Sequence, residues 1–83
     1  MHRVEFTIEP FVEGQPGPHV TAAIDAAAAL GLEVEVGPFG SGCVVPAART
    51  ADVVAAVVRA AIEHGADHVN IDVQQVDDPE PGR

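Results

Sequence analysis

Alternation of apolar and polar side chains near both ends of the chain restricts its fold more than any other feature. In VEFTIEPF (residues 4–11) every second side chain is apolar as far as Ile8, and HVNIDVQ (residues 68–74) has the same arrangement. A period of two is typical of a β-strand with one face in the core. Both stretches are therefore predicted to be strands, and the first should end at Pro10, which has no N–H for a ladder hydrogen bond.

Two helices are predicted between these strands. Residues 18–30 are rich in alanine, begin at a proline, and stop before Gly31, a residue type that commonly ends a helix. Residues 50–64 begin at Thr50, which we expect to be the N-cap, and stop before Gly65.

A hairpin is predicted between the two helices. Residues 32–36 alternate again, GPFGSG (37–42) is a glycine-rich turn, and CVVPA (43–47) is the returning strand. The resulting order βαββαβ predicts an α+β ferredoxin-like plait, which is a four-stranded antiparallel sheet with two helices on one face. We expect one domain over residues 1–76 and a disordered acidic tail over residues 77–83.

The charge of the chain excludes several classes of partner. Its 83 residues carry a formal net charge of −9, and all the basic residues are arginines. Phosphate backbones and anionic lipids require a cationic surface, so neither nucleic acid nor a membrane is expected as a partner. Because no apolar run approaches the roughly 20 residues that span a bilayer, we expect a cytoplasmic protein.

The single cysteine and two of the histidines are given structural roles. Cys43 has no second thiol with which to form a disulfide, and we expect it to be a small buried hydrophobic residue. His2 and His19 are expected on the surface.

Polar side chains gather on the face of the predicted sheet that no helix covers. The first, second and last strands are expected to place there Glu5, Thr7, Glu9, Glu33, Glu35, His68, Asn70, Asp72 and Gln74. Carboxylates crowded on one surface repel one another, and a cation, a donor-rich ligand or a partner's arginine would relieve that repulsion. A polar face that only meets water is the alternative, and the pattern alone leaves both open.

Neither a metal site nor a catalytic centre is predicted. His68 and Asp72 share a face, but successive positions on one face of a strand lie about 6.6–6.8 Å apart, and no third ligand is identified. The sequence contains neither GxSxG nor HExxH. Glu5 and Glu9 lie on an open strand, where nothing shelters an acid–base pair or separates its pKa values. We therefore expect no enzyme.

The second helix is apolar around most of its circumference, and its large apolar residues are Val53, Val54, Val57, Val58 and Ile62. A helix of this kind is usually buried on more than one side. A contact between subunits is therefore expected there, although apolar residues are also tolerated singly on surfaces.

Three stretches together resemble the small thiamine-binding proteins of the MTH1187/YkoF-like family: VEFTIEPF, LGLEVEVGPFGS and VVRAAIEHGADHVNIDVQ. The first strand in this family commonly reads F-S-L-Y-P, and FTIEP keeps Phe6 and Pro10, with Glu9 in place of the aromatic residue. The family's hairpin often reads G-P-M-G-T, which GPFGS (37–41) matches at four positions when the hydroxyl of Ser41 is counted. Many members carry an acidic residue beyond the hairpin, which GCVVP in this chain lacks.

This resemblance covers about residues 3–76 and implies both a fold and a function. It implies a ferredoxin-like plait, self-association as a dimer or tetramer with sheets packed face to face, and binding of thiamine or its hydroxymethylpyrimidine portion without catalysis. Thiamine is expected as a ligand, and no cofactor is expected. The residues that we assign to ligand binding are Glu5, Thr7, Glu9, Ser41, Asn70 and Asp72.

The ligand suits these residue types. Thiamine has a thiazolium cation, which favours carboxylates, and an aminopyrimidine ring, which favours amide and hydroxyl groups. A structural or regulatory module that docks on a protein and takes no small ligand is the alternative function. A small isomerase-like or oxygenase-like dimeric plait is a third, for which the sequence supplies no acid–base set.

Overall fold

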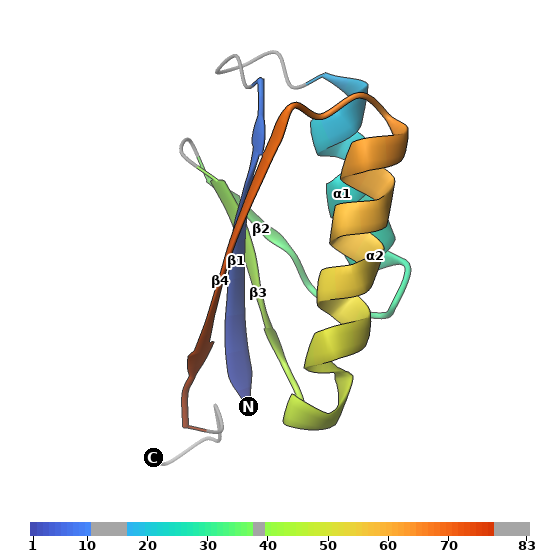
Figure 1. Ribbon diagram of the computed structural model, residues 1–83. Helices are drawn as coiled ribbons and strands as arrows, with labels where there is room; N and C mark the ends of the chain where they lie inside the picture. Colours follow the sequence, from blue (N-terminus) through green and yellow to red (C-terminus); the bar gives the residue numbers. More distant parts are fainter. Residues whose placement is uncertain (11–16, 38–39, 78–83) are drawn as a thin grey trace.

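The computed structural model describes residues 1–10, 17–37 and 40–77, and these form one sheet with two helices on one side of it (Figure 1). The elements along the chain are β1 (His2–Glu9), α1 (Pro18–Ala28), β2 (Glu35–Gly37), β3 (Gly40–Val45), a 3-10 turn (Ala47–Arg49), α2 (Thr50–Glu63) and β4 (His68–Gln75). All strand pairs are antiparallel, and the strands lie in the order β2-β3-β1-β4. This is the predicted ferredoxin-like plait. No helix in the described part of the chain is long and apolar enough to cross a membrane.

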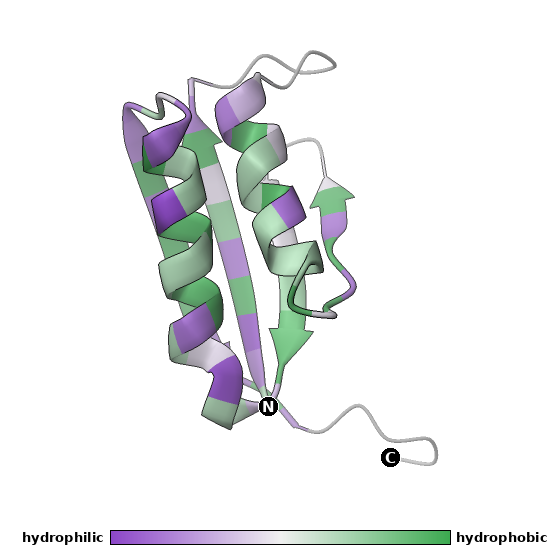
Figure 2. Cartoon of the chain, turned by 90° about the vertical axis from the view of Figure 1, so that its right-hand side faces the viewer, coloured by the Kyte–Doolittle hydropathy of each residue, from purple (hydrophilic) through white to green (hydrophobic). Residues whose placement is uncertain are grey.

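The core lies between the sheet and the two helices. Alternate residues of β1 and β3 point into it, and the alternating hydropathy along β1 is visible in Figure 2. The side chains that are completely or almost completely buried include Val4, Phe6, Ile8, Val45, Val53 and Val57. With little aromatic volume available, the helices approach the sheet through alanine and valine, and burial of a valine side chain contributes roughly 1.5–3 kcal/mol.

The last strand lies beside the first, as the plait requires. β1 and β4 pair from His2 opposite Gln75 to Glu9 opposite His68. The pairing is continued at both ends, because the N–H of Asp67 donates to the carbonyl oxygen of Glu9 and the N–H of Val76 donates to that of Met1. Alternate side chains of these two strands therefore share one face of the sheet along their whole length.

The hairpin differs from the prediction. Residues 32–36 were expected to form a strand, but β2 comprises only Glu35–Gly37, whereas β3 begins at Gly40, three residues before the predicted start. Leu32 and Val34 are apolar because they pack against the core from the connection that precedes β2. The alternation of apolar and polar residues over 32–36 therefore reflects partial burial of Leu32 and Val34 in a connection, where the prediction had a strand.

The start of α2 also differs from the prediction. Thr50 has helical dihedral angles (φ −57°, ψ −47°) and is the first residue of the helix, while Arg49 occupies the N-cap position without a side-chain cap. Thr50 was therefore wrongly predicted as the N-cap. Its hydroxyl instead hydrogen-bonds to Nδ1 of His2 and donates to the carbonyl oxygen of Pro46. The ends of both helices agree better, since Gly31 and Gly65 have the positive φ that glycine permits after a helix.

His19 was expected on the surface, and this prediction was wrong. His19 is buried, and its Nε2 hydrogen-bonds to the carbonyl oxygen of Pro10. The ring also covers Gly17, where an added Cβ would lie 2.5 Å from a ring carbon of His19. A histidine that holds the start of α1 against the end of β1 has no pattern in the sequence to reveal it.

The tail prediction concerns residues 77–83, of which 78–83 lie outside the described residues.

Candidate ligand-binding site

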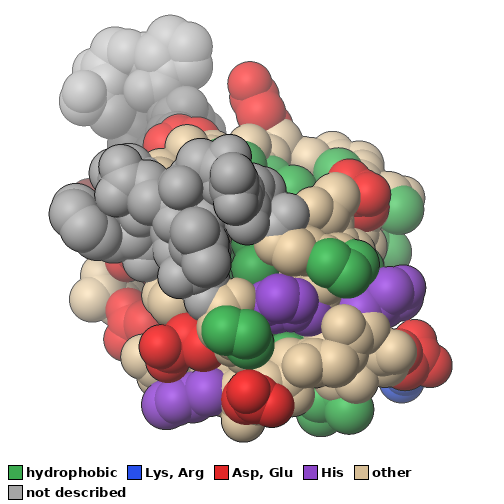
Figure 3. All heavy atoms as spheres, turned by 90° about the horizontal axis from the view of Figure 1, so that it is seen from above, with side chains coloured by type: hydrophobic (Ala, Val, Ile, Leu, Met, Phe, Trp, Pro, Cys, Tyr) green, Lys and Arg blue, Asp and Glu red, His purple; other side chains and the backbone are tan. Residues whose placement is uncertain are grey.

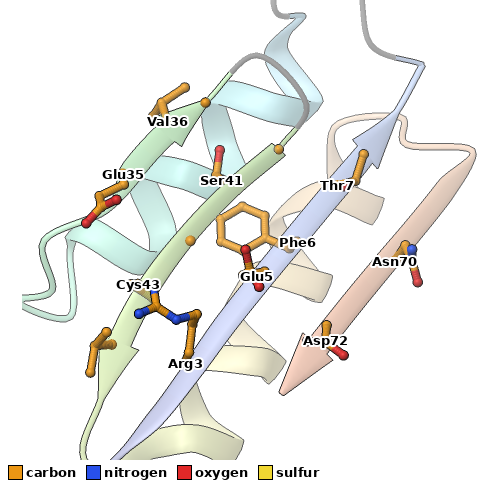
Figure 4. A pocket seen from close by; sticks show the side chains of 14 residues that line it. Arg3, Glu5, Phe6, Thr7, Glu35, Val36, Ser41, Cys43, Asn70 and Asp72 are labelled. Atoms are coloured by element: carbon orange, nitrogen blue, oxygen red, sulfur yellow. The ribbon is translucent and has the colours of Figure 1, made fainter. Parts of the chain in front are cut away.

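The face of the sheet opposite the helices contains a shallow concavity of about 510 Å³ (Figure 4). Residues of all four strands line it. Its charged and polar side chains on this face are Arg3, Glu5, Thr7, Glu35, Asn70 and Asp72. The concavity therefore lies where period-two alternation predicted a polar face.

Three carboxylates lie in one row across this face. In the strand register Glu35 is opposite Gly42, Gly42 is opposite Glu5, and Glu5 is opposite Asp72. All three acidic residues are exposed. Directly opposed like charges destabilise a sheet, and here Glu5 and Asp72 are such a pair. The row is consequently a region of concentrated negative potential that crosses the sheet from β2 to β4.

A second, uncharged row lies beside the first, toward the hairpin. Gly37 pairs with Gly40, and Thr7 pairs with Asn70. An added Cβ on Gly40 would be 3.1 Å from Oγ1 of Thr7, so the Thr7 side chain lies over the backbone of β3. Hydroxyl and amide groups are thus placed next to the carboxylates.

The middle of the concavity has a floor of bare backbone. Gly40 and Gly42 lie on this face of β3 and are followed there by Val44, and Gly37 is opposite Gly40 on β2. Gly42 retains an ordinary extended backbone, and a Cβ there would lie 3.3 Å from Cγ of Glu5 and from the carbonyl oxygen of Val4. Glycine inside a strand often marks a place where a ligand or another backbone approaches closely. Three glycines side by side allow a flat group to lie directly on the sheet.

Arg3 lines the same concavity and was not among the residues assigned from the sequence. It is opposite Val44 on one side and Gln74 on the other, in the row next to the carboxylates. Its side chain extends over β3 (Figure 4). The signal was present in the sequence, because Arg3 belongs to the same alternation as Glu5.

The structure separates Ser41 from the other assigned residues. Ser41 alternates with Gly40 and Gly42, is paired with Phe6, and is buried. Its backbone borders the concavity, but its side chain follows the helix-facing set of β3 that includes Cys43. The hydroxyl therefore belongs to the opposite side of the sheet from Thr7.

Glu9 also lies apart from the concavity. One of its carboxylate oxygens is 3.3 Å from Nδ1 of His68, and both side chains are more than half exposed. This pair lies at the end of the molecule where β1 ends and β4 begins, and histidine and acidic side chains are both present on the surface at that end (Figure 3). Glu33, expected on the second strand, precedes β2 and does not line the concavity. Of the six assigned residues, four contribute side chains to it: Glu5, Thr7, Asn70 and Asp72.

Burial raises the pKa of the Cys43 thiol above its ordinary value, because the thiolate would lose hydration there. Cys43 is thus a packed core residue, as predicted, and is held in the less reactive thiol form. Within residues 1–10, 17–37 and 40–77, no three His, Cys, Asp or Glu side chains are grouped so that they could hold a metal ion.

Comparison with known proteins shows similarity of fold. No protein-family model matches the chain, and no curated protein matches it in sequence. Among solved structures it is similar to the protein SP2199 from Streptococcus pneumoniae, with 20% identity over 94% of this chain and 88% of that one, and a TM-score of 0.56. It is also similar to a domain of unknown function, DUF77, from Bacillus cereus, with 21% identity over 88% of this chain and 71% of that one, and a TM-score of 0.52. The chain therefore shares the α+β ferredoxin-like fold of these structures.

Proposed function

We propose that this chain is a non-enzymatic binding protein for thiamine or its hydroxymethylpyrimidine portion, with the ligand held on the open face of the sheet. The observation that supports it most is the row formed by Glu35, Glu5 and Asp72 across a glycine floor. The sequence resemblance to the MTH1187/YkoF-like family and the similarity in fold to a DUF77 domain are compatible with this function.

The chemistry of the ligand matches the two rows of the concavity. A thiazolium ring over the acidic row would neutralise carboxylates that otherwise repel one another. An aminopyrimidine has donor and acceptor edges for Thr7 and Asn70, while the glycines permit either ring to lie flat against β3. A volume of about 510 Å³ lies within the range of sites that hold small molecules.

Self-association would strengthen such binding. The open face is covered by no described element, so a ligand there keeps water on one side. We propose that a second copy closes over the face, because removal of water lowers the local dielectric and strengthens each charged contact. The non-enzymatic character of the proposal rests on the exposed, unsheltered carboxylates, which provide no acid–base pair.

Thermal unfolding in the presence of ligands tests the proposal. Thiamine at 100 times its dissociation constant should raise the free energy of unfolding by about 2.7 kcal/mol. The hydroxymethylpyrimidine should also stabilise, whereas tetramethylammonium at the same concentration should not. If neither thiamine nor the pyrimidine shifts the transition, the proposal fails.

Two carboxylate variants sharpen this test. Glu5→Gln and Asp72→Asn should each weaken thiamine binding about tenfold in calorimetric titrations, because each removes one charge from the row without changing its shape. Glu63→Gln is the matched control, since Glu63 is an exposed residue of α2 on the other side of the sheet. Equal affinities for all three variants would contradict the site.

A structural or regulatory module without a small ligand is the second candidate function. It is favoured by exposed apolar side chains, of which Val36 (64% exposed) and Ile62 (61%) are the most exposed large ones among the described residues. In that case replacing Glu5 and Asp72 together should reduce the mass of the assembly in light scattering, with no response to thiamine in either form. An unchanged mass would argue against this candidate.

A further inference from the structure

Arg3 has the wrong charge for a site that takes only a cation. The chain has a net charge of −9, and three carboxylates line the concavity, yet a guanidinium group extends into it from β1. Among the described residues Arg3 forms no ion pair with any of these carboxylates. A direct ion pair with these carboxylates therefore does not account for its position.

The strand register separates the positive and negative parts of the concavity. Arg3 and Glu5 are alternate residues of β1, so their Cα atoms are about 6.6–6.8 Å apart. The cross-strand neighbours of Arg3 are Val44 and Gln74, and neither is acidic. The carboxylates all belong to the adjacent row of Glu5. One end of the concavity thus favours a cation and the other end favours an anion.

We propose that the preferred ligand is zwitterionic: a phosphate ester of thiamine, whose ring cation lies over the acidic row and whose phosphate binds Arg3. This inference rests on the proposed function and specifies which form of the ligand is bound. In thiamine monophosphate a two-carbon arm joins the phosphate to the thiazolium ring, so the two charges are separated as the two rows of the sheet are.

An arginine is suited to this role. Its guanidinium presents parallel N–H donors that bind two phosphate oxygens at once, which a lysine ammonium does not do. Gln74, which is opposite Arg3 on β4, carries an amide in the same row, outside the residues that line the concavity. The neighbouring carboxylates oppose the phosphate, so the preference for the ester arises only when the ring cation occupies their row.

Calorimetric titration of thiamine and thiamine monophosphate into wild-type protein, Arg3→Gln and Arg3→Lys tests the inference. The wild type should bind the monophosphate about tenfold more tightly than thiamine. Arg3→Gln should abolish this preference by weakening the monophosphate alone, and Arg3→Lys should retain part of it. Arg59→Gln is the matched control, because it removes the same charge from the exposed surface of α2 and should leave both affinities unchanged.

The outcomes separate this inference from the proposed function. Equal wild-type affinities for the two ligands, or an equal loss of both in Arg3→Gln, would overturn the role of Arg3 while leaving thiamine binding intact. A loss of monophosphate binding in Arg59→Gln equal to that in Arg3→Gln would also overturn it, because the effect would then reflect net charge. If neither ligand binds the wild type, the proposed function and this inference fall together.

Discussion

Two glycines illustrate, at the scale of single residues, how one residue type meets different needs. Gly31 has a φ of +85° and nothing within 4 Å of an added Cβ, so its requirement is conformational. Gly42 lies in β3 without a positive φ, and a Cβ there would press on Glu5 and Val4. The requirement at Gly42 is therefore for space above the sheet.

Alanine substitutions at these two positions should affect different properties: ligand binding for Gly42 and stability for Gly31. Gly42→Ala should weaken thiamine binding about tenfold and change the free energy of unfolding by less than about 1 kcal/mol, because the methyl group fills the floor but fits an extended strand. Gly31→Ala should lower stability by about 1 kcal/mol through left-handed strain and leave binding unchanged. Urea unfolding and calorimetry on both variants measure this contrast, and a similar profile for the two would contradict the glycine floor.

The burial of Cys43 predicts a dependence on alkaline pH. Its folded pKa is raised, so the folded state retains the thiol proton at pH values where the unfolded chain has lost it. The resulting stability is fully present below the ordinary thiol pKa of about 8.5 and is lost as the pH rises toward the folded value. Unfolding free energies measured from pH 7.5 to 10 should therefore decline.

The composition simplifies the interpretation of this pH dependence. The chain has no lysine and no tyrosine, so the two side-chain types that most often titrate at alkaline pH beside cysteine are absent. Cys43→Ala should show a flatter profile than the wild type. A decline of the same size in the alanine variant would assign the effect to another group.

At the scale of the elements, the sequence predicted strands and helices that have a periodic side-chain pattern, and it missed contacts that individual residues make. Periodic alternation located β1 and β4, and alanine-rich segments between a proline and glycines located the helices. The connection before β2 was mistaken for a strand because Leu32 and Val34 are partly buried against the core without strand pairing. Likewise, His19 is buried and hydrogen-bonds to the carbonyl oxygen of Pro10, a contact that leaves no periodic pattern in the sequence.

The site followed the same division. Alternation correctly placed Glu5, Thr7, Asn70 and Asp72 on one face, because β1 and β4 are long and directly paired. Ser41 was assigned by resemblance, and its side depended on the register of β3, which begins earlier than predicted. The glycine floor was not predicted, because Gly40 and Gly42 were assigned to a turn. The structure places both in β3 beside β1, and a glycine-rich stretch alone does not show whether it forms a turn or part of a strand.

The two sides of α2 should respond differently to truncation. Val57 is completely buried, and Val57→Ala should lower the free energy of unfolding by about 2 kcal/mol through lost burial and a cavity. Ile62 is 61% exposed, and Ile62→Ala should change the stability of an isolated chain by less than about 0.5 kcal/mol. Chemical unfolding at several protein concentrations distinguishes the cases: a larger, concentration-dependent loss for Ile62→Ala would place this side of α2 in a contact between subunits.

At the scale of the whole molecule, charge repulsion opposes folding and assembly together. Thirteen acidic residues are set against four basic ones, and the row of Glu35, Glu5 and Asp72 concentrates part of this excess on one face. Exposed charges are screened over about 10 Å at 0.1 M salt. Added salt should therefore relieve the repulsion and, at the same time, weaken the attraction of a cationic ligand.

Salt should thus shift stability and binding in opposite directions. Between 50 and 500 mM sodium chloride, the melting temperature of the ligand-free protein should rise, while the dissociation constant for thiamine should increase several-fold. Calorimetry and thermal unfolding on the same samples measure both quantities. A dissociation constant that does not change with salt would indicate that the acidic row takes no part in binding.

The recess on the open face is created by the absence of side chains on Gly40 and Gly42 of β3. No rearrangement of a strand is needed to uncover it, so an incoming molecule meets a surface that is already shaped, and little conformational entropy is lost when it settles. Association should then be limited by diffusion and orientation. Differences in affinity among related ligands should therefore appear mainly in their dissociation rates.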